Sequence, residues 1–594
     1  MVCQGTGGYG KIDASLKPYL AVHAKGGFMR DVYAEKPWIQ HYDSNVPPAL
    51  TYEETTFAEM FRKTADAWPD KSALIYMGKR LTFRDVDKIS NRIARYLIQR
   101  GLKPNDVIGL HLPNIPAHYI AVIAAQKAGC ISTGLSPLLM PTEMAHQITD
   151  SGLKMIFTVD VLFGKLAEIA NNTHFTTVVV SEIADFLPGV KRMIGKLLKK
   201  IPTGVVSPLA GKTIERFTTI LKETSDDPVM VSRNVDDPIF MMYTGGTTGP
   251  AKGAVLTQKS YMCNRLQVLT WLDMQPDDTV LSAFPMFHMA GLALGAGAIT
   301  MGMTQICVPN PRDTHFLIHS IKSYHPTMMV NVPTVYFELM KKPAFRNLNF
   351  DNIKWLLSAA APFPKENIQE LESVIGKNKF IELYGMTETS PVTCCNPRYG
   401  LKKAGSIGLP MPDTEFKLID PETGIPAEPG EPGEIVIRGP QVMREYHNKP
   451  NETAHALKDG WIFTGDVARM DADGYFYIVD RLKDMVIVSG FKVFTKELDD
   501  VLSKHPDISL AASVGIPDPD RPGSERVACA IVLKPGVNTS DIEKEKILGY
   551  LKQNVAPYNI PRLIRFMDQL PTSAVGKILK REIRKLLSDD TAIP

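Results

Sequence analysis

Residues 239–253 read Ile239-Phe240-Met241-Met242-Tyr243-Thr244-Gly245-Gly246-Thr247-Thr248-Gly249-Pro250-Ala251-Lys252-Gly253. The first four residues are all apolar, which is typical of a buried strand. The eleven residues from Tyr243 to Gly253 contain four glycines, three threonines and one lysine. Their backbone amides, hydroxyl groups and positive charge suit a polyphosphate. The spacing does not fit a Walker A loop, and an ordinary turn between strands is the alternative interpretation.

Strands and helices alternate around this segment. A strand at 73–76 precedes a helix that Thr82 opens and Gly101 closes, and a strand at 107–112 precedes a helix at 116–127. The same alternation continues through 130–135, 141–152, 155–158 and 280–383. Repeated units of this kind predict parallel sheets covered by helices.

The composition of the chain changes after Asp480. The four residues 481–484 are mostly polar, and a new alternation of strands and helices follows them. A chain of 594 residues is expected to form two or three domains. We therefore expect an irregular extension at 1–48, a main domain at 49–480, a hinge at 481–484 and a small domain at 485–594.

Overall composition excludes several classes of protein. The chain is 44% hydrophobic and 22% charged, with a net charge of +3, and shows no basic-aromatic pattern, so we expect no nucleic-acid partner. Residues 1–17 lack the pattern of a signal peptide, and 289–308 contain four glycines, which favours a buried helix and strand over a membrane span. The seven cysteines lack metal-ligand spacing, which indicates reduced thiols and a cytoplasmic protein.

Two later motifs carry side chains that suit a nucleotide. In Glu382-Leu383-Tyr384-Gly385-Met386-Thr387-Glu388, which we place after a strand, Tyr384 can stack on a purine, Thr387 can bond the α-phosphate, and Glu388 can bind Mg²⁺. The small-residue turn 358–362 can lie against an adenine ring. A strand edge with a solvated glutamate is the alternative for the first motif.

Three charged residues further along the chain extend this pattern. Asp466, in Thr464-Gly465-Asp466, can accept both ribose hydroxyls, although such a residue is more often part of a turn. Arg481 can pair with ribose or phosphate. Lys577 ends Pro571-Thr572-Ser573-Ala574-Val575-Gly576-Lys577, and its ammonium can hold a carboxylate and the α-phosphate together. A solvated lysine is the alternative.

In these motifs the chain closely resembles bacterial long-chain fatty acyl-CoA synthetases, which are adenylate-forming enzymes. The resemblance begins at Tyr52 and includes 405–410, 439–443 and 480–485. It implies an α/β adenylation (AMP-binding) domain with helix-covered, mostly parallel sheets at 49–480, followed by a small mobile α+β lid domain.

The resemblance also implies a two-step reaction. A fatty acid attacks the α-phosphate of ATP, with Mg²⁺ as cofactor, to give an acyl adenylate and pyrophosphate; the thiol of CoA then displaces AMP. The lid rotates between the steps, with Lys483 at the pivot. The chemistry itself needs two arrangements, because Lys577 would obstruct the thiol in the second step.

The site residues follow from the same motifs. The resemblance implies Thr244, Glu388 and Lys577 as catalytic residues, the first two also as metal ligands. With them, it implies an ATP-binding set of Gly245, Gly246, Thr247, Thr248, Gly249, Lys252, Ala360, Ala361, Tyr384, Gly385, Met386, Thr387, Asp466, Ile478 and Arg481. Contacts to CoA are expected at Ser489, Gly490 and Phe491, and to the acyl group at His288, for which a structural role is equally open.

The sequence departs from the family pattern at several positions. Ala359 and Ala360 stand where glycines are common, Lys492 and Thr495 where asparagine and proline are frequent, and Ser524 where glycine is usual. These changes concern the CoA contacts more than the adenylation site.

Residues 190–201 are predicted to form an amphipathic helix. Its apolar residues are Val190, Met193, Ile194, Leu197, Leu198 and Ile201, and its basic residues are Lys191, Arg192, Lys196, Lys199 and Lys200. This pattern is typical of a helix on an anionic membrane surface, here the inner face of the membrane, and the alternative is a helix that covers the protein's own core.

Several functions remain open at this stage. A CoA ligase for a medium-chain, aryl or bile acid, a fatty acyl-AMP ligase that loads a carrier protein, and a non-catalytic acyl- or nucleotide-binding protein are the alternatives to a fatty acid–CoA ligase. The five residues Thr244, Glu388, Asp466, Arg481 and Lys577 together favour an enzyme. Acyl length and oligomeric state are open, a homodimer being one option.

Overall fold

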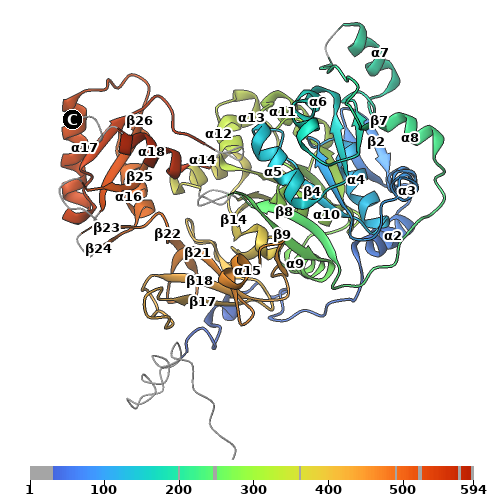
Figure 1. Ribbon diagram of the computed structural model, residues 1–594. Coiled ribbons are helices and arrows are strands. Elements are labelled where there is room, and N and C mark those ends of the chain that lie inside the picture. Colours follow the sequence, from blue (N-terminus) through green and yellow to red (C-terminus); the bar gives the residue numbers. More distant parts are fainter. Residues whose placement is uncertain are drawn as a thin grey trace, which may run out of the picture.

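The computed structural model describes residues 31–198, 201–244, 250–359, 363–488, 491–518, 525–572 and 577–589. Within these residues, two helix-covered sheets and an antiparallel sheet form the large domain, and the residues after 485 form a small domain at one side of it (Figure 1). Most strand pairs in the two covered sheets are parallel, as the sequence predicts.

The first covered sheet contains the strand that ends in Gly385. Its strands lie in the order β16 (Leu409–Pro410), β15 (Val392–Cys395), β14 (Phe380–Gly385), β13 (Trp355–Ser358), β12 (Met328–Asn331), β10 (Thr279–Ser282), β11 (Thr304–Cys307), β1 (Ser72–Tyr76) and β2 (Lys79–Thr82). Associated helices are α10 (Met289–Ile299), α11 (Thr314–Tyr324), α12 (Pro333–Met340), α13 (Pro343–Arg346) and α14 (Lys365–Ile375).

The second covered sheet contains the strand that precedes the glycine–threonine loop. Its order is β19 (Glu445–Tyr446), β9 (Lys252–Thr257), β8 (Pro238–Thr244), β4 (Ile131–Gly134), β3 (Val107–His111), β5 (Met155–Val159), β6 (Thr177–Ser181) and β7 (Thr213–Arg216). Its part of the chain includes α2 (Phe57–Ala67), α3 (Phe83–Gln99), α4 (Pro116–Lys127), α5 (Pro141–Ser151), α6 (Phe163–Ile169), α7 (Gly189–Leu197), α8 (Phe217–Glu223) and α9 (Gln258–Trp271).

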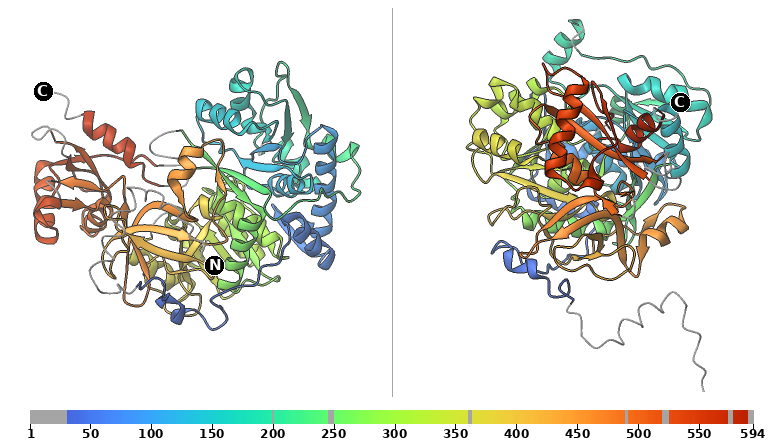
Figure 2. Two further views of the ribbon diagram at one scale, coloured as in Figure 1. Left: turned by 60° about the horizontal axis from the view of Figure 1, so that its bottom comes forward. Right: turned by 90° about the vertical axis from the view of Figure 1, so that its left-hand side faces the viewer.

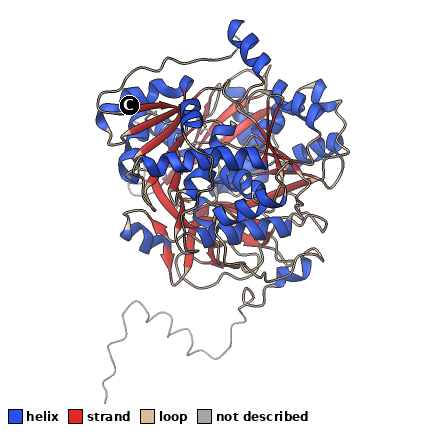
Figure 3. Cartoon of the chain, turned by 90° about the vertical axis from the view of Figure 1, so that its right-hand side faces the viewer, coloured by secondary structure: helices blue, strands red, loops and turns tan. Residues whose placement is uncertain are grey.

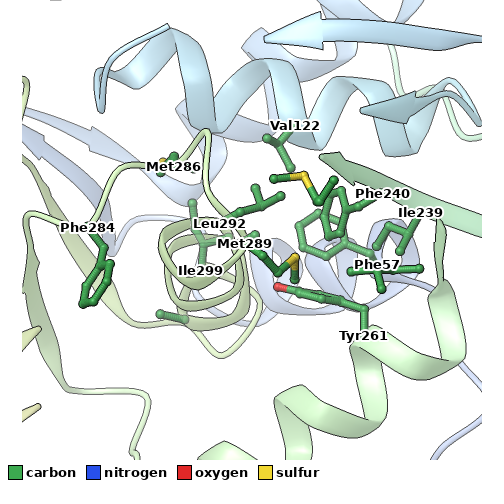
Figure 4. Close-up of a cluster of buried hydrophobic side chains, with 14 of the residues drawn as sticks. Phe57, Val122, Ile239, Phe240, Tyr261, Phe284, Met286, Met289, Leu292 and Ile299 are labelled. Carbon is green, nitrogen blue, oxygen red and sulfur yellow. The ribbon is translucent and has the colours of Figure 1, made fainter. Parts of the chain in front are cut away.

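Local sequence explains why these helices form where they do. Thr82 caps α3 through a reciprocal capping box with Asp85. Helix α4 begins at Pro116, which has no amide hydrogen to leave unpaired at that position, and is buried on all sides. The core that results joins the two covered sheets, because Val122 of α4, Phe240 of β8 and Leu292 of α10 belong to one buried cluster (Figure 4).

An antiparallel sheet completes the large domain. It consists of β17 (Glu415–Ile419), β18 (Gly433–Arg438), β21 (Trp461–Met470), β20 (Leu457–Lys458) and β22 (Phe476–Arg481), with α15 (Pro450–Ala456) beside it. The sequence indicated short strands in this region but not the sheet. Residues 31–48 pack against it: the ring of buried Trp38 lies 5.8 Å from that of Phe476.

The small domain has a core of its own. It contains the hairpin β23 (Val486–Val488) and β24 (Phe491–Val493), a sheet ordered β25 (Ile508–Pro517), β26 (Glu525–Leu533) and β27 (Leu563–Phe566), and the helices α16 (Thr495–Leu502), α17 (Asp541–Asn554) and α18 (Lys580–Asp589). A turn connects the domains: β22 ends at Arg481, whose carbonyl accepts a hydrogen bond from the amide of Met485 at 3.0 Å.

Two further expectations concern thiols and membranes. The six cysteines in the described part of the chain are free and buried, in line with reduced thiols. Among the described residues, no helix combines the length and apolar character needed to cross a bilayer. Residues 289–308 form α10 and β11, as predicted.

Candidate active site

The glycine–threonine segment connects two antiparallel strands. Thr244, the last residue of β8, pairs with Lys252, the first residue of β9, so that these two side chains stand at the base of the loop. The adjacent Tyr243 donates a hydrogen bond of 2.7 Å from its hydroxyl to Asp150 of α5. The predicted site residues Gly245, Gly246, Thr247, Thr248 and Gly249 lie outside the described residues.

The motif from Glu382 to Glu388 begins inside a strand rather than after one. Strand β14 continues to Gly385, because pairing with β15 extends that far. A Cβ atom on Gly385 would lie 1.9 Å from the carbonyl oxygen of Pro391, which explains why this position holds glycine. The short 3-10 helix η5 (Thr387–Thr389) follows and packs against β8 and β9. The two motifs are therefore neighbours in space.

Glu388 is buried at this meeting point, with 6% of its surface exposed. Its Oε1 atom accepts a 2.7 Å hydrogen bond from the hydroxyl of Tyr446, and the Nζ atom of Lys252 lies 4.7 Å from the centre of the Tyr446 ring. Burial raises the pKa of Glu388, against the opposing effects of the Tyr446 hydrogen bond and the charge of Lys252. Tyr446 belongs to none of the predicted motifs, and no feature of its surrounding sequence indicated it.

Asp466 and Arg481 form an ion pair between two strands. They are direct partners across β21 and β22, and the Arg481 Nε atom lies 2.9 Å from Asp466 Oδ1. The hydroxyl of Tyr384 donates to Asp466 Oδ2 at 2.7 Å. Asp466 is therefore a strand residue and not part of a turn, because β21 continues past Gly465 to Met470.

Lys577 of the small domain approaches this pair. Lys577 is exposed to solvent, but neighbouring protein atoms exclude part of the water around it. This partial desolvation and the positive charge of Arg481 lower the pKa of Lys577 to about 8. The charges of Asp466 and Lys483 also act on it. Tyr384 of β14, the Asp466–Arg481 pair of β21 and β22, and Lys577 just before α18 thus lie close together, although they are far apart in the sequence.

His288 lies within range of the same lysine charge. It caps α10, since its Nδ1 atom accepts a 3.3 Å hydrogen bond from the amide of Ala290. Burial lowers its pKa, and the positive charge of Lys577 lowers it further. His288 therefore has a structural role as the cap of α10 and lies within electrostatic range of Lys577.

The other predicted residues are distributed as follows. Met386 directly precedes η5, Thr387 is its first residue, and Ile478 lies in β22 opposite Ala468. Lys483 lies in the connecting turn, where burial and the charge of Arg481 lower its pKa. Phe491 opens β24, is 55% exposed, and stacks on Tyr558 with a centroid distance of 4.7 Å. The predicted residues outside the described part of the chain also include Ala360, Ala361, Ser489 and Gly490.

Comparison with known proteins gives consistent matches. Residues 61–447 match the model of the AMP-binding enzyme family, and 497–577 match that of the AMP-binding enzyme C-terminal domain. Proteins named long-chain-fatty-acid–CoA ligase are similar over nearly their whole length. That of Bacillus subtilis (strain 168) is 34% identical, and the match covers 94% of this chain and 99% of the relative. That of Yersinia pestis is also 34% identical, and the match covers 93% of this chain and 98% of the relative.

Solved structures agree on the fold. An anthranilate CoA ligase, AuaEII, in complex with anthranoyl-AMP has a TM-score of 0.79 at 22% identity, covering 92% of this chain and 99% of its own. ATP-bound MatB from Rhodopseudomonas palustris has a TM-score of 0.76 at 25% identity, covering 90% and 100%. The fold class and the resemblance inferred from the motifs are confirmed. The chain belongs to the AMP-binding enzyme family.

Proposed function

We propose that this protein is an ATP-dependent fatty acid–CoA ligase. It converts a fatty acid, ATP and CoA into acyl-CoA, AMP and pyrophosphate through an acyl adenylate. The observation that carries this proposal is the approach of Lys577, from the small domain, to the Asp466–Arg481 pair and Tyr384 of the large domain. Relatives named for this activity span nearly the whole chain, which supports the fatty acid as substrate class.

ATP is assigned to the space around the converging motifs. Asp466 is held in place by Arg481 and Tyr384, so its carboxylate is already oriented to accept the ribose hydroxyls. The base of the glycine–threonine loop, with Thr244 and Lys252, is assigned to the phosphates. The loop residues 245–249, the turn at 360–361 and the segment 384–388 complete the nucleotide site in this proposal.

Glu388 and Thr244 suit a magnesium ion. Both offer hard oxygen atoms, and η5 packs against the strand that ends in Thr244. Burial disfavours the charged form of Glu388, and a bound cation would offset that cost. When bound with the nucleotide, magnesium supplies charge neutralisation at the phosphates.

Lys577 is assigned to the adenylation step. A carboxylate and an α-phosphate are both negative, so their approach is repulsive unless a cation lies between them. The ammonium of Lys577 supplies this charge and orients both groups. The same position would block the thiol of CoA, so the small domain has to turn about Lys483 before the second step. Ser489, Gly490 and Phe491 are then assigned to CoA, and His288 to the acyl group.

Helix α7 is assigned to a membrane surface. It projects from the body of the large domain (Figure 1), and the same projection is visible from the side (Figure 3). Val190, Met193, Ile194 and Leu198 are 46–67% exposed, so these side chains do not cover the protein's own core. Basic residues alternate with them in the sequence, which suits anionic lipid. A substrate that partitions into lipid could then reach the enzyme without crossing water.

The proposed reaction can be tested with the full-length protein and acids of two to eighteen carbons. With ATP, Mg²⁺ and CoA we expect thioester, AMP and pyrophosphate, with the highest kcat/KM for long-chain acids, measured by mass spectrometry and pyrophosphate release. Reactions without ATP or without CoA are the controls. Release of acyl adenylate without thioester, or a preference for an aryl acid, would contradict the proposal.

Replacement of Lys577 should separate the two steps. We expect Lys577→Ala to lower acid-dependent ATP–pyrophosphate exchange by at least about a hundredfold, because one charge at the reacting groups is removed. Thioester formation from supplied acyl adenylate and CoA should be nearly unchanged. Lys585→Ala, at an exposed position of α18, is the control. An equal loss of both half-reactions would show that Lys577 has a different role.

Adenylation should depend on pH through Lys577. Its pKa near 8 means that the ammonium form is lost as the pH rises through that value. We expect kcat/KM for pyrophosphate exchange to fall with a midpoint near pH 8, since this parameter reports groups of the free enzyme. In Lys577→Arg the guanidinium stays charged, so the residual activity should lack this decrease. A decrease at the same pH in the arginine variant would assign it to another group.

Membrane contact through α7 can be measured by vesicle sedimentation. We expect binding to phosphatidylglycerol vesicles to exceed binding to phosphatidylcholine vesicles. It should fall at least about tenfold when Lys191, Lys196, Lys199 and Lys200 are replaced by Glu, or when Val190 and Met193 are replaced by Ser. The control makes the same charge change at the exposed residues Lys341, Lys377, Lys504 and Lys552. Unchanged binding of both α7 variants would refute the assignment.

A further inference from the structure

The end of β22 is bound directly to the small domain. Asp480, which is 3% exposed, precedes Arg481 and accepts hydrogen bonds from Thr495, the first residue of α16. The Thr495 amide donates to Asp480 Oδ2, and the Thr495 hydroxyl lies 3.2 Å from Oδ1 and 3.1 Å from Oδ2. The amide of Arg481 donates to Oδ1 at 2.8 Å. The carboxylate of Asp480 therefore links the last strand of the large domain to the first helix of the small one.

The same contact continues into α18. The Nζ atom of Lys580 donates to the hydroxyl of Thr495 at 2.7 Å and forms an ion pair with Asp499 of α16 at 2.8 Å. Both side chains of this ion pair are 17% exposed. Asp499 is fixed in turn by the amide of Ser513 in β25, at 2.6 Å. Burial lowers the pKa of Lys580, but the charges of Asp499 and Asp480 outweigh it and raise the pKa, so Lys580 is a cation.

The place of Lys580 in the chain connects this network to the reaction. Lys580 is the first residue of α18 and lies three positions after Lys577. A contact that holds Lys580 against α16 and Asp480 therefore also restricts where Lys577 can lie relative to Arg481, the residue directly after Asp480. Asp480, which binds Thr495, and Arg481, which pairs with Asp466, are adjacent residues at the end of β22.

Other contacts cross the same boundary at the surface. Lys492 of β24 lies 2.8 Å from Glu422, and Arg469 of β21 lies 3.5 Å from Glu497 of α16. Exposed pairs of this kind contribute little. The backbone amide of Thr495 is part of the contact between the domains, and a proline at this position would have no amide hydrogen to donate to Asp480. Figure 2 shows the small domain, in red, beside the antiparallel sheet, in orange.

We propose that Asp480, Thr495, Asp499 and Lys580 form an interdomain latch that holds the small domain in the orientation that presents Lys577 to the Asp466–Arg481 pair. They are positioning residues for adenylation, and the Asp480–Thr495 contact has to open before the CoA step. This inference rests on the proposed function, because it assigns the orientation to the first of two half-reactions. Of these contacts only Asp480–Thr495 crosses between the domains, so its hydrogen bonds favour the orientation in which it is closed. Lys580 and Asp499 hold Thr495 and the start of α18 in place within the small domain.

Half-reactions of latch variants provide the kinetic test. We expect Lys580→Met and Thr495→Val to lower kcat of acid-dependent ATP–pyrophosphate exchange at least about tenfold, with KM for ATP nearly unchanged, because the nucleotide contacts of the large domain remain. Thioester formation from supplied acyl adenylate should be unchanged or faster. Lys580→Arg should restore most of the exchange activity, and Lys585→Met, on the exposed face of the same helix, should have no effect.

Interdomain distance provides a test that does not depend on activity. Spin labels are placed at Val205→Cys in the large domain and Ile542→Cys in the small one, which are 87% and 79% exposed, after Cys3 is replaced by Ser. We expect one dominant distance in the parent protein and a broader distribution in Lys580→Met and Thr495→Val, with thermal unfolding used to confirm that each variant is folded.

The outcomes separate the latch from the proposed function. An unchanged distance distribution in both folded variants, or an equal loss of both half-reactions, would overturn the latch. A broadened distribution in a protein whose parent catalyses no adenylation would uphold the latch as a conformational contact and overturn the proposed function instead. If Lys580→Met does not fold, Thr495→Val decides, because it removes one hydroxyl and keeps the backbone amide that donates to Asp480.

Discussion

The ion pair between Asp466 and Arg481 is the contact on which the site depends. It joins two adjacent strands of the antiparallel sheet, and Tyr384 extends it to the end of the first covered sheet. Arg481 is also the last residue of the large domain before the connecting turn. This ion pair therefore links a sheet, a second sheet and the turn that leads into the small domain, so any displacement of β22 would move all three together.

Charge is unevenly distributed around this pair. Arg481, Lys483 and Lys577 bring positive charge close together, and the pKa values of both lysines are lowered as a result of burial and of the charge of Arg481. Repulsion among like charges is tolerated where a ligand of opposite charge is to be bound. Asp466 and Glu388 lie within the same region and balance part of this charge. A polyphosphate substrate would complete the balance, which agrees with membership of the AMP-binding enzyme family.

The two covered sheets provide the rigid support for these groups. Helices α4 and α10 lie within a buried cluster shared by the sheets, and the hairpin β8–β9 packs against η5. Thr244, Tyr384 and Arg481 lie at or near strand ends and Lys483 in the connection that follows, whereas Asp466 lies inside β21. Such positions are common for ligand sites, because the sheet fixes the backbone while the loops supply polar groups.

Much of the fold could be predicted from the sequence, because strong local signals act within a few residues. Pro116 and the apolar run after it determined α4, Thr82 with Asp85 determined the start of α3, and the motifs around Thr244, Glu388, Asp466 and Lys577 identified the family. Only the tertiary structure decided which side chains these residues contact. Asp466 is held by Arg481 and Tyr384, and Glu388 is held by Tyr446. Asp480 likewise binds Thr495. The antiparallel sheet was missed for the same reason, since its pairings join short strands separated by loops. Local propensity depends on neighbours in the chain, whereas these contacts join distant residues and form only when the sheets and domains pack.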